Sequence, residues 1–446
     1  MKFVDLFAGL GGFHQALNAL GHKCVFASEL NGPLAELYEK NFGIRPHGDI
    51  RKHWEDVPPH DILCAGFPCQ PFSKAGDQLG FDCPQWGDLF DYVINILERR
   101  RPRFLIIENV PNLMRHNGGQ TWSAVCRRLE QCGYAIGSKR LSPHNFGVPQ
   151  ARERAIIVGD RFGLDGFDWP GGAPMDAASE IGSILDRDPP NAKRLSERAI
   201  GYIEAWQELL EKLPQNRDLP SFPIWAMEFG ADYPYQDGTP YSYGWGQLGK
   251  CRGALGVRLS GLSLDQVKAS IPTYARSSVD RFPKWKVDFI RQNREFYTQN
   301  KVIIDDWLPR IRSFSSSFQK LEWNWKGGER NLWKTIIQFR ASGIRAKRPN
   351  VAPSLVALTT TQVPVISWEK RYMTVRECAR LQSMDGLTHL PSDRTGAFKA
   401  LGNAVNVTVM TAVANALLSR PKPTASAVSF SPMNYRGALP EMSPAE

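Results

Sequence analysis

Several signatures of common protein classes are missing from this sequence. No run of apolar residues approaches the roughly 20 residues that a membrane-spanning helix needs, and the first residues do not have the architecture of a signal peptide. The 8 cysteines are scattered singly, without a CxxC pair or a Cys/His cluster at zinc-ligand spacing. We therefore expect a cytoplasmic protein with no membrane association, no disulfide framework and no metal site.

A dinucleotide-binding fingerprint is also missing, because the first glycine-rich turn, Gly9-Leu-Gly11-Gly12, does not fit GxGxxG. This argues against a nucleotide-dependent oxidoreductase. Residues 2–6 nevertheless predict a strand, and residues 13–19 predict a helix. A strand, a glycine turn and a helix together bring a ligand against the backbone amides of a helix N-terminus. The turn alone is weak evidence, since some such turns bind nothing.

The composition is that of an ordinary globular protein, with 42% hydrophobic and 22% charged residues. A length of 446 residues favours two domains over a single core. The sequence changes character twice, so we expect a first domain over residues 1–165, a second over 166–350 and a return to the first over 351–420. Residues 421–446 are rich in Pro, Ser and Ala without periodicity, which predicts a disordered tail.

The positive charge is concentrated in one region. The chain has a net charge of +10, and residues 281–350 contain 16 Lys or Arg against 6 Asp or Glu, an excess that equals the whole net charge. A segregated basic region indicates a polyanionic partner, with nucleic acid favoured, whereas a generally basic solvated surface would not predict segregation. Eight of the 13 tryptophans lie between Trp206 and Trp333, and five of these eight lie among the cations of residues 281–350. Tryptophans at this density more often form a domain's own core than contact bases.

Two acidic residues follow the next predicted strand tips. Glu29 comes directly after a strand predicted over residues 24–28, where a carboxylate is placed to accept hydrogen bonds from ribose hydroxyls. Asp49 ends a third segment and either accepts a hydrogen bond from an adenine amino group or caps the short stretch that follows it. With the glycine turn, these residues describe a nucleoside pocket without an obvious phosphate site.

A cysteine between two prolines follows the next predicted strand. Residues 62–65 form an apolar run typical of a buried parallel strand, and Pro68 and Pro71 then flank Cys69. Prolines on both sides exclude a helix and continued sheet pairing, so we expect Cys69 in a stiff turn at the carboxyl edge of the sheet, where ligands bind. Its thiol is either a nucleophile or a small buried hydrophobic group. The polar residues 74–86 are long enough to act as a lid.

An acid and two arginines are expected near the same edge. Residues 104–107 predict an apolar strand that ends in Glu108, and burial in an apolar cleft would raise the pKa of this carboxyl and allow it to hold or donate a proton. Arg152 and Arg154 alternate on an extended segment, so both guanidinium groups point to one side. They are either solvated charges of an edge strand or groups that recognise an anion or a polarised carbonyl.

Six motifs carry a resemblance to a known family. In order along the chain they are Asp5-Leu-Phe-Ala-Gly-Leu-Gly-Gly-Phe13, Gly66-Phe-Pro-Cys-Gln-Pro-Phe-Ser73, Glu108-Asn-Val110, Gln150-Ala-Arg-Glu-Arg154, Arg371-Tyr-Met-Thr-Val-Arg-Glu-Cys-Ala-Arg-Leu-Gln382 and Gly402-Asn-Ala-Val405. Together they resemble the DNA (cytosine-5)-methyltransferase family of the bacterial modification type. The resemblance covers residues 1–160 and 340–415 and does not cover the middle of the chain.

This resemblance implies the fold and the site. The fold class is α/β, with a Rossmann-like S-adenosylmethionine-dependent methyltransferase sheet, helices on both faces, and a smaller, irregular target-recognition domain in the middle of the chain. S-adenosyl-L-methionine is the methyl donor, and no metal is needed. The cofactor-binding positions that it implies are Phe7, Gly9, Gly11, Glu29, Asp49, Pro68 and Asn403. The catalytic positions that it implies are Cys69 as nucleophile, Glu108 as the acid that engages the cytosine, and Arg152 and Arg154 beside the base and its loop.

The resemblance also implies an activity and its partners. A sequence-specific enzyme would methylate C5 of a flipped-out cytosine in double-stranded DNA, as a monomer, and protect host DNA in a restriction–modification system. A cognate restriction endonuclease would act on the same sequence without need of direct contact. An RNA (tRNA) cytosine-5 methyltransferase with the same site is the nearest alternative. A catalytically inactive DNA-binding relative is another, against which the intact catalytic set argues. One departure is Trp86-Gly87, where the family often has Arg-Gly, and it concerns closure of the lid.

Overall fold

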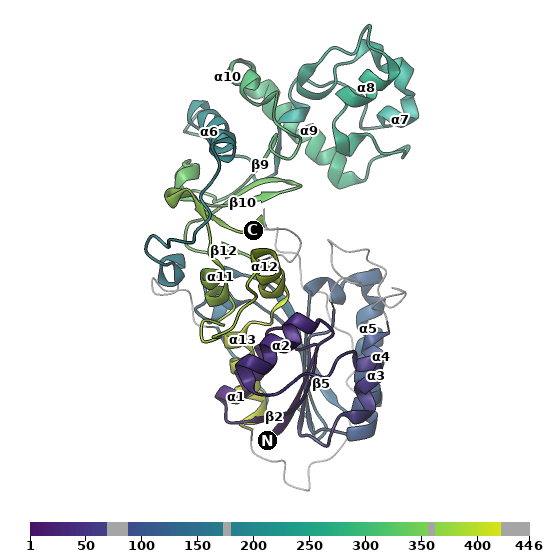
Figure 1. Cartoon of the computed structure of the whole chain (residues 1–446). Helices are drawn as coiled ribbons and strands as arrows, with labels where there is room; N and C mark the ends of the chain where they lie inside the picture. The colour runs from purple at the N-terminus through teal and green to yellow at the C-terminus, as the bar shows by residue number, and fades with distance from the viewer. Residues whose placement is uncertain (69–87, 173–179, 356–361, 421–446) are drawn as a thin grey trace. The chain divides into compact units, whose positions relative to one another are not determined.

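The computed structural model describes residues 1–68, 88–172, 180–355 and 362–420. The chain divides into two compact units, which are labelled by their elements in Figure 1. The first unit is formed by Met1–Arg187, Asn350–Thr360 and Thr374–Glu446, and the second by Asp188–Pro349 and Thr361–Met373. Four features predicted from the sequence lie outside the described residues, namely Cys69, the loop over residues 74–86, the Trp86-Gly87 pair and the tail over 421–446.

A six-stranded sheet forms the centre of the first unit, in the order β2-β1-β3-β4-β7-β5. The strands β1 to β4 are parallel, whereas β7 runs antiparallel to both β4 and β5. Four carboxyl ends therefore meet at one edge of the sheet, as the sequence predicted. The bounds of the strands are β1 Lys2–Leu6, β2 Lys23–Ser28, β3 Ile62–Ala65, β4 Phe104–Asn109, β5 Ala135–Leu141 and β7 Arg154–Asp160.

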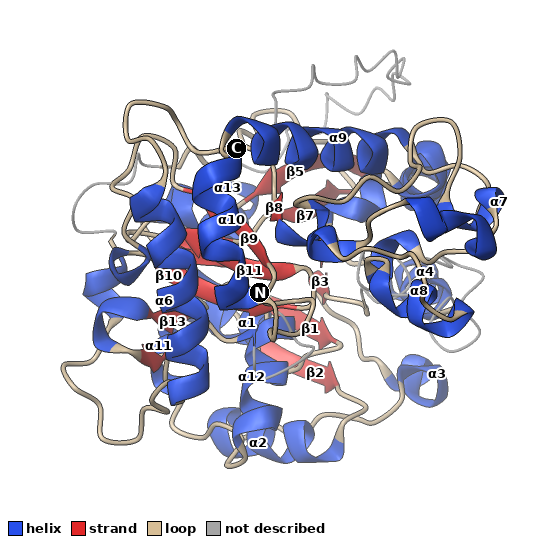
Figure 2. Cartoon of the chain, turned by 90° about the horizontal axis from the view of Figure 1, so that it is seen from above, coloured by secondary structure: helices blue, strands red, loops and turns tan. Residues whose placement is uncertain are grey.

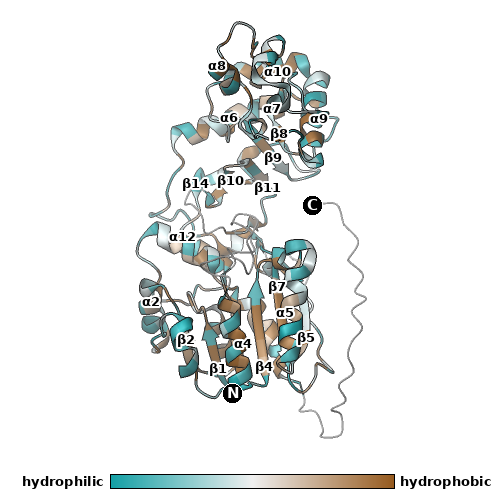
Figure 3. Ribbon diagram, turned by 90° about the vertical axis from the view of Figure 1, so that its right-hand side faces the viewer, coloured by the Kyte–Doolittle hydropathy of each residue, from teal (hydrophilic) through white to brown (hydrophobic). Residues whose placement is uncertain are grey.

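Helices cover both faces of this sheet, which confirms the predicted α/β fold class (Figure 2). The helices α4 (Leu89–Arg100) and α5 (Gln120–Gln131) bury apolar side chains against one face. The helices α1 (Gly12–Ala19) and α13 (Val407–Leu418) pack on the other. The strand β4 is hydrophobic along most of its length, whereas α4 has a hydrophobic side and a hydrophilic side (Figure 3). Parallel strands covered on both faces have this continuous apolar character.

The segment that leads to Asp49, the third predicted to reach the edge of the sheet, does not form a full strand. It contributes only an isolated parallel bridge between His47 and Ser28 of β2. The short helices α3 (Ile50–His53) and η1 (Trp54–Asp56) follow directly. Asp49 therefore lies in a loop beside the end of β2. It is near the carboxyl edge of the sheet as predicted, although no full strand precedes it.

The chain returns to the first unit at Asn350. The strand β12 (Ala352–Pro353) pairs with β6 (Gln150–Ala151), and α11 (Val375–Leu381) and α12 (Arg394–Asn403) follow. By length and composition alone, the helical stretch Arg394–Leu418 could cross a membrane. Half of its most apolar window is buried inside the protein, and its second part, α13, packs on the sheet. Buried core helices pass the same test, so the stretch is weak evidence for a membrane span.

The second unit contains its own six-stranded sheet, in the order β14-β13-β10-β11-β9-β8. Alternate side chains of its central strands pack against α6 (Glu197–Lys212) and α10 (Lys301–Trp307). A separate apolar cluster surrounds α8 (Leu264–Ser270) and α9 (Lys284–Gln299). The strands are β8 Ile224–Trp225, β9 Lys320–Asn324, β10 Ile336–Arg340, β11 Gly343–Lys347, β13 Val365–Ile366 and β14 Arg371–Tyr372.

Most tryptophans of the second unit belong to its own core, as the sequence predicted. Trp206 and Trp307 are fully buried, and their rings lie 5.0 Å apart between centroids. Trp225 and Trp323 are also buried. Trp285 differs, because it is 55% exposed at the start of α9. The density of aromatic residues in this region is therefore explained mainly by packing.

The division between the units differs from the predicted domain boundaries. The first unit extends to Arg187 instead of residue 165, because Arg380 donates hydrogen bonds to the Ile184 carbonyl at 2.9 Å and to Asp186 at 2.7 Å. Residues 361–373 were expected in the return segment. They belong to the second unit because β13 and β14 pair with each other and with β10 of its sheet.

Candidate active site

A large cavity lies at the carboxyl edge of the first unit's sheet. Its volume is about 950 Å³, within the usual range for cofactor sites. It is lined by residues that follow β1, β2, β3 and β4, by residues beside β7, and by residues from His389 to Val405. Nine of the eleven site residues predicted from the sequence line it, namely Phe7, Gly9, Glu29, Asp49, Pro68, Glu108, Arg152, Arg154 and Asn403.

The loop after β1 contains three residues in the left-handed region, with φ angles of 59° at Phe7, 54° at Gly9 and 78° at Gly11. Glycine adopts this conformation at little cost, whereas Phe7 stores strain of about 1–3 kcal/mol. Hydrogen bonds to Ser28 hold the loop, since the Phe7 amide donates to its hydroxyl at 3.3 Å and the Ala8 amide donates to its carbonyl at 2.9 Å. The loop is therefore fixed against the end of β2 in a shape that turns its backbone toward the cavity.

Gly11 does not line the cavity, although the sequence predicted a cofactor contact there. A Cβ atom at this position would lie 2.3 Å from the ring of Phe42, at the end of α2 (Gly32–Phe42). The glycine thus permits the loop to pack closely on α2. The prediction that Gly11 contacts the cofactor rests on the sequence alone.

A buried polar network beneath this loop was missed by sequence reasoning. The Tyr38 hydroxyl donates to Asp5 at 3.3 Å and lies 2.7 Å from Nδ1 of His14. Burial raises the pKa of Asp5 well above its ordinary value and lowers the pKa of His14 to about 4. The only signal in the sequence was a polar residue inside an otherwise apolar strand and another on the buried side of the first helix. These groups stabilise the loop after β1 and do not line the cavity.

Two backbone amides fix the Glu29 carboxylate at the wall of the cavity. One carboxylate oxygen accepts from the Gly9 amide at 2.8 Å, and the other accepts from the Asn31 amide at 2.8 Å. Burial raises the pKa of Glu29, and these backbone donors partly offset that rise. A carboxylate fixed in this way has lone pairs left for further donors, such as vicinal hydroxyls.

Asp49 has the capping role that the sequence left open, and it lies at the cavity wall, while its contact with adenine stays a prediction. It caps α3, since its carboxylate accepts from the Arg51 amide at 3.1 Å, and it also lines the cavity. The Arg51 side chain donates to the same carboxylate, with Nη2 at 2.8 Å from Oδ2, and lowers its pKa. Asp49 is therefore ionised and remains an acceptor at the cavity wall.

Arg152 joins two segments that are distant in the sequence. Its guanidinium donates to the carbonyls of Gly402 at 2.9 Å, Ala404 at 3.0 Å and Leu355 at 3.0 Å. Gly402 and Ala404 are the neighbours of Asn403, so Arg152 fixes the backbone on both sides of a predicted cofactor-binding residue. These bonds are charge-assisted and nearly buried, which makes them strong.

Glu108 and Arg154 form an ion pair at the cavity wall, with 2.9 Å between Arg154 Nε and Glu108 Oε1. Both side chains are largely buried. Burial raises the pKa of Glu108 as the sequence predicted, while Arg154 and Arg152 act in the opposite direction. The carboxyl can therefore exist as an acid closer to neutral pH than an exposed glutamate, beside a permanent positive charge.

The turn that leads to Cys69 reaches the same cavity. Pro68 lines it, and the Phe67 carbonyl accepts a hydrogen bond at 3.2 Å from the Asn109 side chain, next to Glu108. β3 and β4 are neighbours in the sheet, so Pro68, which follows β3, and Glu108, near the end of β4, lie at the same edge of the sheet. Cys69 itself lies outside the described residues, and its place as the nucleophile stays a prediction.

Comparison with known proteins gives a decisive match. A family model described as C-5 cytosine-specific DNA methylase matches residues 1–419. The chain belongs to the C-5 cytosine-specific DNA methylase family. This confirms the resemblance drawn from the six motifs, and the chain is a DNA (cytosine-5)-methyltransferase, a class of enzyme that uses S-adenosylmethionine as methyl donor.

Individual members of the family resemble the chain to different extents. The Type II methyltransferase M.AluI of Cellulosimicrobium cellulans is 32% identical over 92% of this chain and 90% of its own length. M.MspI of a Moraxella species is 41% identical over 42% of this chain and 44% of its own length. M.HhaI of Haemophilus parahaemolyticus is 40% identical over 38% of this chain and 53% of its own length. Similarity to M.AluI thus extends over almost the whole chain, whereas similarity to the other two covers less than half of it.

A solved structure supports the fold. A protein encoded within a prophage of E. coli, assigned as a DNA modification methyltransferase, is 16% identical and superimposes with a TM-score of 0.51 over 94% of this chain and 100% of its own. At this identity the likeness concerns the fold alone. It agrees with the α/β sheet and its two covered faces.

Proposed function

We propose that this DNA (cytosine-5)-methyltransferase modifies one cytosine within a specific duplex sequence and protects host DNA in a restriction–modification system. The observation that carries the proposal is the Glu108–Arg154 ion pair at 2.9 Å in a cavity that also holds Glu29, Asp49 and Asn403. The proposed reaction requires an acid for the base and acceptors for a nucleoside in one cavity, and these residues could supply both.

We assign the attacking group to Cys69. C5 of cytosine is a poor nucleophile, so the thiolate adds to C6 and the electron pair of the C5–C6 double bond becomes available at C5. After methylation the C5 proton leaves to a base, which water can supply, and the electron pair of that C–H bond restores the double bond as Cys69 departs. The base must leave the duplex for this attack, at a cost of a few kcal/mol.

Glu108 stabilises the adduct. When protonated, it donates to N3 of the cytosine and offsets the negative charge that develops as the thiolate adds to C6. Arg154 holds this carboxyl in place through its Nε and adds a positive charge at the same wall. Arg152 acts as a positioning residue, since its donors are engaged by backbone carbonyls.

The cavity fits S-adenosylmethionine in its chemistry. Glu29 would accept from the ribose hydroxyls, Asp49 from the adenine amino group, and the open space beside Gly9 would admit the methionine part. When bound, the cofactor supplies an electrophilic methyl group on a sulfonium, whose departure requires no metal. Asn403 would close the pocket from the segment that Arg152 fixes.

The second unit would read the target sequence. The residues 281–350, which carry the excess of positive charge, fall in it almost entirely. Cations that contact phosphates position a protein on duplex DNA, and contacts to base edges then specify the sequence. We further infer that the enzyme is a cytoplasmic monomer and that a cognate endonuclease would act on the same sequence without contact to it.

Bisulfite sequencing of DNA from cells that express the chain tests the proposal. Expression should protect cytosines within one recurrent sequence, and Cys69→Ala should abolish this protection while DNA binding stays measurable. Protection by the Cys69→Ala variant at a level near that of the wild type would overturn the assignment.

The alternative of an RNA substrate is tested with the same protein. Methyl transfer from labelled S-adenosylmethionine is compared between duplex DNA that contains the recovered sequence and unmodified tRNA. We expect incorporation into DNA only. Incorporation into tRNA and none into DNA would replace the proposal with an RNA (cytosine-5)-methyltransferase.

A further inference from the structure

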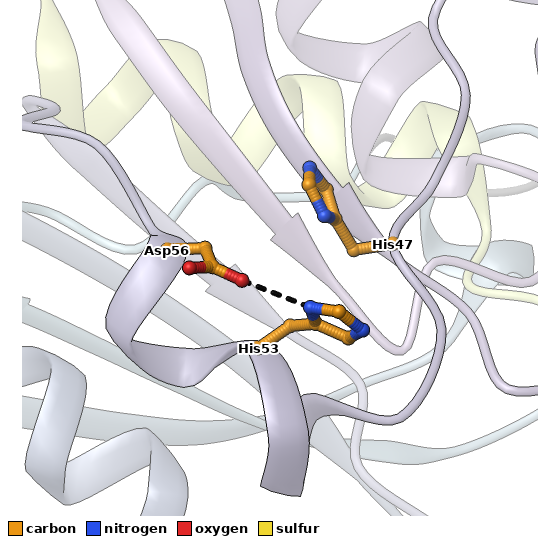
Figure 4. A group of neighbouring side chains, drawn as sticks. All are labelled: His47, His53 and Asp56. Atoms are coloured by element: carbon orange, nitrogen blue, oxygen red, sulfur yellow. Dashed lines mark hydrogen bonds and ion pairs between the residues drawn. The ribbon is translucent and has the colours of Figure 1, made fainter.

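Three side chains with metal-binding atoms lie close together on the first unit, apart from the lining of the cavity. His47 follows β2 in the bridge to Ser28, His53 ends α3, and Asp56 ends η1. One ligand atom from each of the three lies within 4.8 Å of the others. Figure 4 shows the two imidazole rings and the carboxylate around a common space.

Each of the two imidazoles is already oriented. His53 Nδ1 lies 2.9 Å from Asp56 Oδ2 (Figure 4). The ring of His47 stacks on Phe26, with centroids 4.3 Å apart and planes 12° from parallel. The backbone of His47 is fixed at both polar groups, because its amide donates to the Ala27 carbonyl and its carbonyl accepts from the Glu29 amide, both at 2.8 Å.

An ordinary ion pair accounts for only part of this arrangement. A hydrogen bond between His53 and Asp56 needs no further group and is common on protein surfaces. It does not explain why a second imidazole is held beside it, with the ring centroids of His47 and His53 5.4 Å apart and the planes tilted by 54°. Two nitrogen donors and one carboxylate that face one space form a typical partial coordination shell.

We propose that His47, His53 and Asp56 form a binding site for a divalent transition-metal ion of the zinc class. Imidazole nitrogen favours such ions over Mg²⁺ and Ca²⁺, which prefer oxygen ligands. In a tetrahedral zinc site the ligand atoms lie about 3.3 Å apart, as follows from Zn–N distances of about 2.0–2.1 Å. The present separations of up to 4.8 Å close to this value by rotation of side chains, of which His47 and Asp56 are exposed. Water would complete the coordination.

The position of the site gives the ion a structural role. His47 directly precedes Gly48 and Asp49, which line the cavity, and its carbonyl binds the amide of Glu29. An ion held by His47, His53 and Asp56 would tie the loop around Asp49 to both β2 and η1. It would restrict local opening of this wall, and it would take no part in methyl transfer.

Isothermal titration of the full-length chain with Zn²⁺ tests the site. We expect one ion per chain at this site, and a dissociation constant at least tenfold weaker in His47→Gln and in His53→Gln. Asp56→Asn keeps a polar group beside His53 and should weaken binding by a smaller factor. Mg²⁺ should give no binding that depends on these residues. His116→Gln, which changes a half-buried histidine elsewhere in the same unit, is the matched control and should bind like the wild type.

Hydrogen exchange locates the bound ion without reliance on activity. Zn²⁺ should slow amide exchange over residues 48–56 in the wild type and in His116→Gln, and leave it unchanged in His53→Gln. No binding by the wild type, or equal Zn²⁺ affinity in the wild type and both histidine variants, would overturn the proposal. Either result would leave the proposed methyl transfer untouched, since that is measured on DNA.

Discussion

Arg152 and Arg154 stand two residues apart, and their side chains take different partners. Arg154 pairs with the carboxyl of Glu108, whereas Arg152 binds three backbone carbonyls from later parts of the chain. The first therefore acts on the electrostatics of the acid, and the second acts on the shape of the pocket. Substitutions of Arg154 should therefore change the pKa of Glu108, whereas substitutions of Arg152 should change the shape of the pocket.

The pH dependence of kcat/KM should report the raised pKa of Glu108. Only the protonated carboxyl donates to N3, so the rate should fall as the pH rises through this pKa. In Arg154→Ala the fall should move to higher pH, because the lost positive charge favoured the ionised carboxylate. Glu108→Gln should lower kcat by about 10²–10⁴-fold and remove this fall. Methyl transfer to a duplex substrate is measured from pH 5 to 9.

Two outcomes would contradict this account. The same fall in Glu108→Gln as in the wild type would assign it to another group. A shift to lower pH in Arg154→Ala would mean that the arginine does not stabilise the ionised carboxylate. Binding of the same DNA by each variant serves as the control for folding.

At the scale of residues, the sequence predicted which residues lie at the edge of the sheet better than it predicted which groups they contact. Glu29 and Glu108 could be placed because each lies at the carboxyl end of a strand, the edge of the sheet where ligands bind. The partners of Arg152 could not be predicted, because Gly402 and Ala404 lie about 250 positions away and only the fold brings them together. The approach of His47 to His53 has the same origin, since it depends on a bridge to β2.

At the scale of elements, the loop after β1 and the loop after α12 are packed against each other. A Cβ atom on Gly12 would lie 2.5 Å from the Val405 carbonyl oxygen and 3.0 Å from Val405 Cβ. The backbone of Gly12 has no positive φ, so its glycine is required by close approach and not by conformation. The first turn of α1 therefore sets the position of the segment that carries Asn403.

Gly12→Ala should weaken binding of S-adenosylhomocysteine at least tenfold, because the loop directly after Asn403 must move. Gly21→Ala is the matched control. Gly21 has a φ of +77° at the other end of α1, and its Cβ would meet nothing within 4 Å. The control should lose about 1–2 kcal/mol of stability through backbone strain and keep its cofactor affinity. Calorimetric titration and urea denaturation of both variants measure the two effects. Equal cofactor affinity in Gly12→Ala and the wild type would contradict the proposed coupling of the loops.

Elements were predicted well where hydrophobic periodicity was strong and poorly where a strand was short. The apolar runs of β3 and β4 and the helical spacing in α4 needed no tertiary information. The third segment, before Asp49, was expected to end as a strand and retains one bridge. It is short and lies at the edge of the sheet beyond β2, where few backbone partners are available.

At the scale of the whole molecule, the cavity and the excess of positive charge lie in different compact units. All of the described residues that line the cavity belong to the first unit, and the basic residues 281–350 fall almost entirely in the second. The domain plan could be inferred because motifs flank a basic, tryptophan-rich insert. The exact boundaries could not, since they depend on whether segments such as β13 pair with one sheet or the other.

The salt dependence of DNA binding should therefore depend on the second unit. Neutralisation of three exposed cations in it, Arg312→Gln, Lys326→Gln and Arg348→Gln, should weaken binding and make the plot of log K against log salt less steep. Each lost phosphate contact should reduce the slope by about 0.9, because fewer counterions are released from the DNA. The matched control is Lys2→Gln, Lys23→Gln and Arg99→Gln, which removes three exposed cations near the amino edge of the first unit's sheet, away from the cavity. The control should keep the wild-type slope, and an equal reduction in both triple variants would show that net charge, and not a surface of the second unit, governs the affinity for DNA.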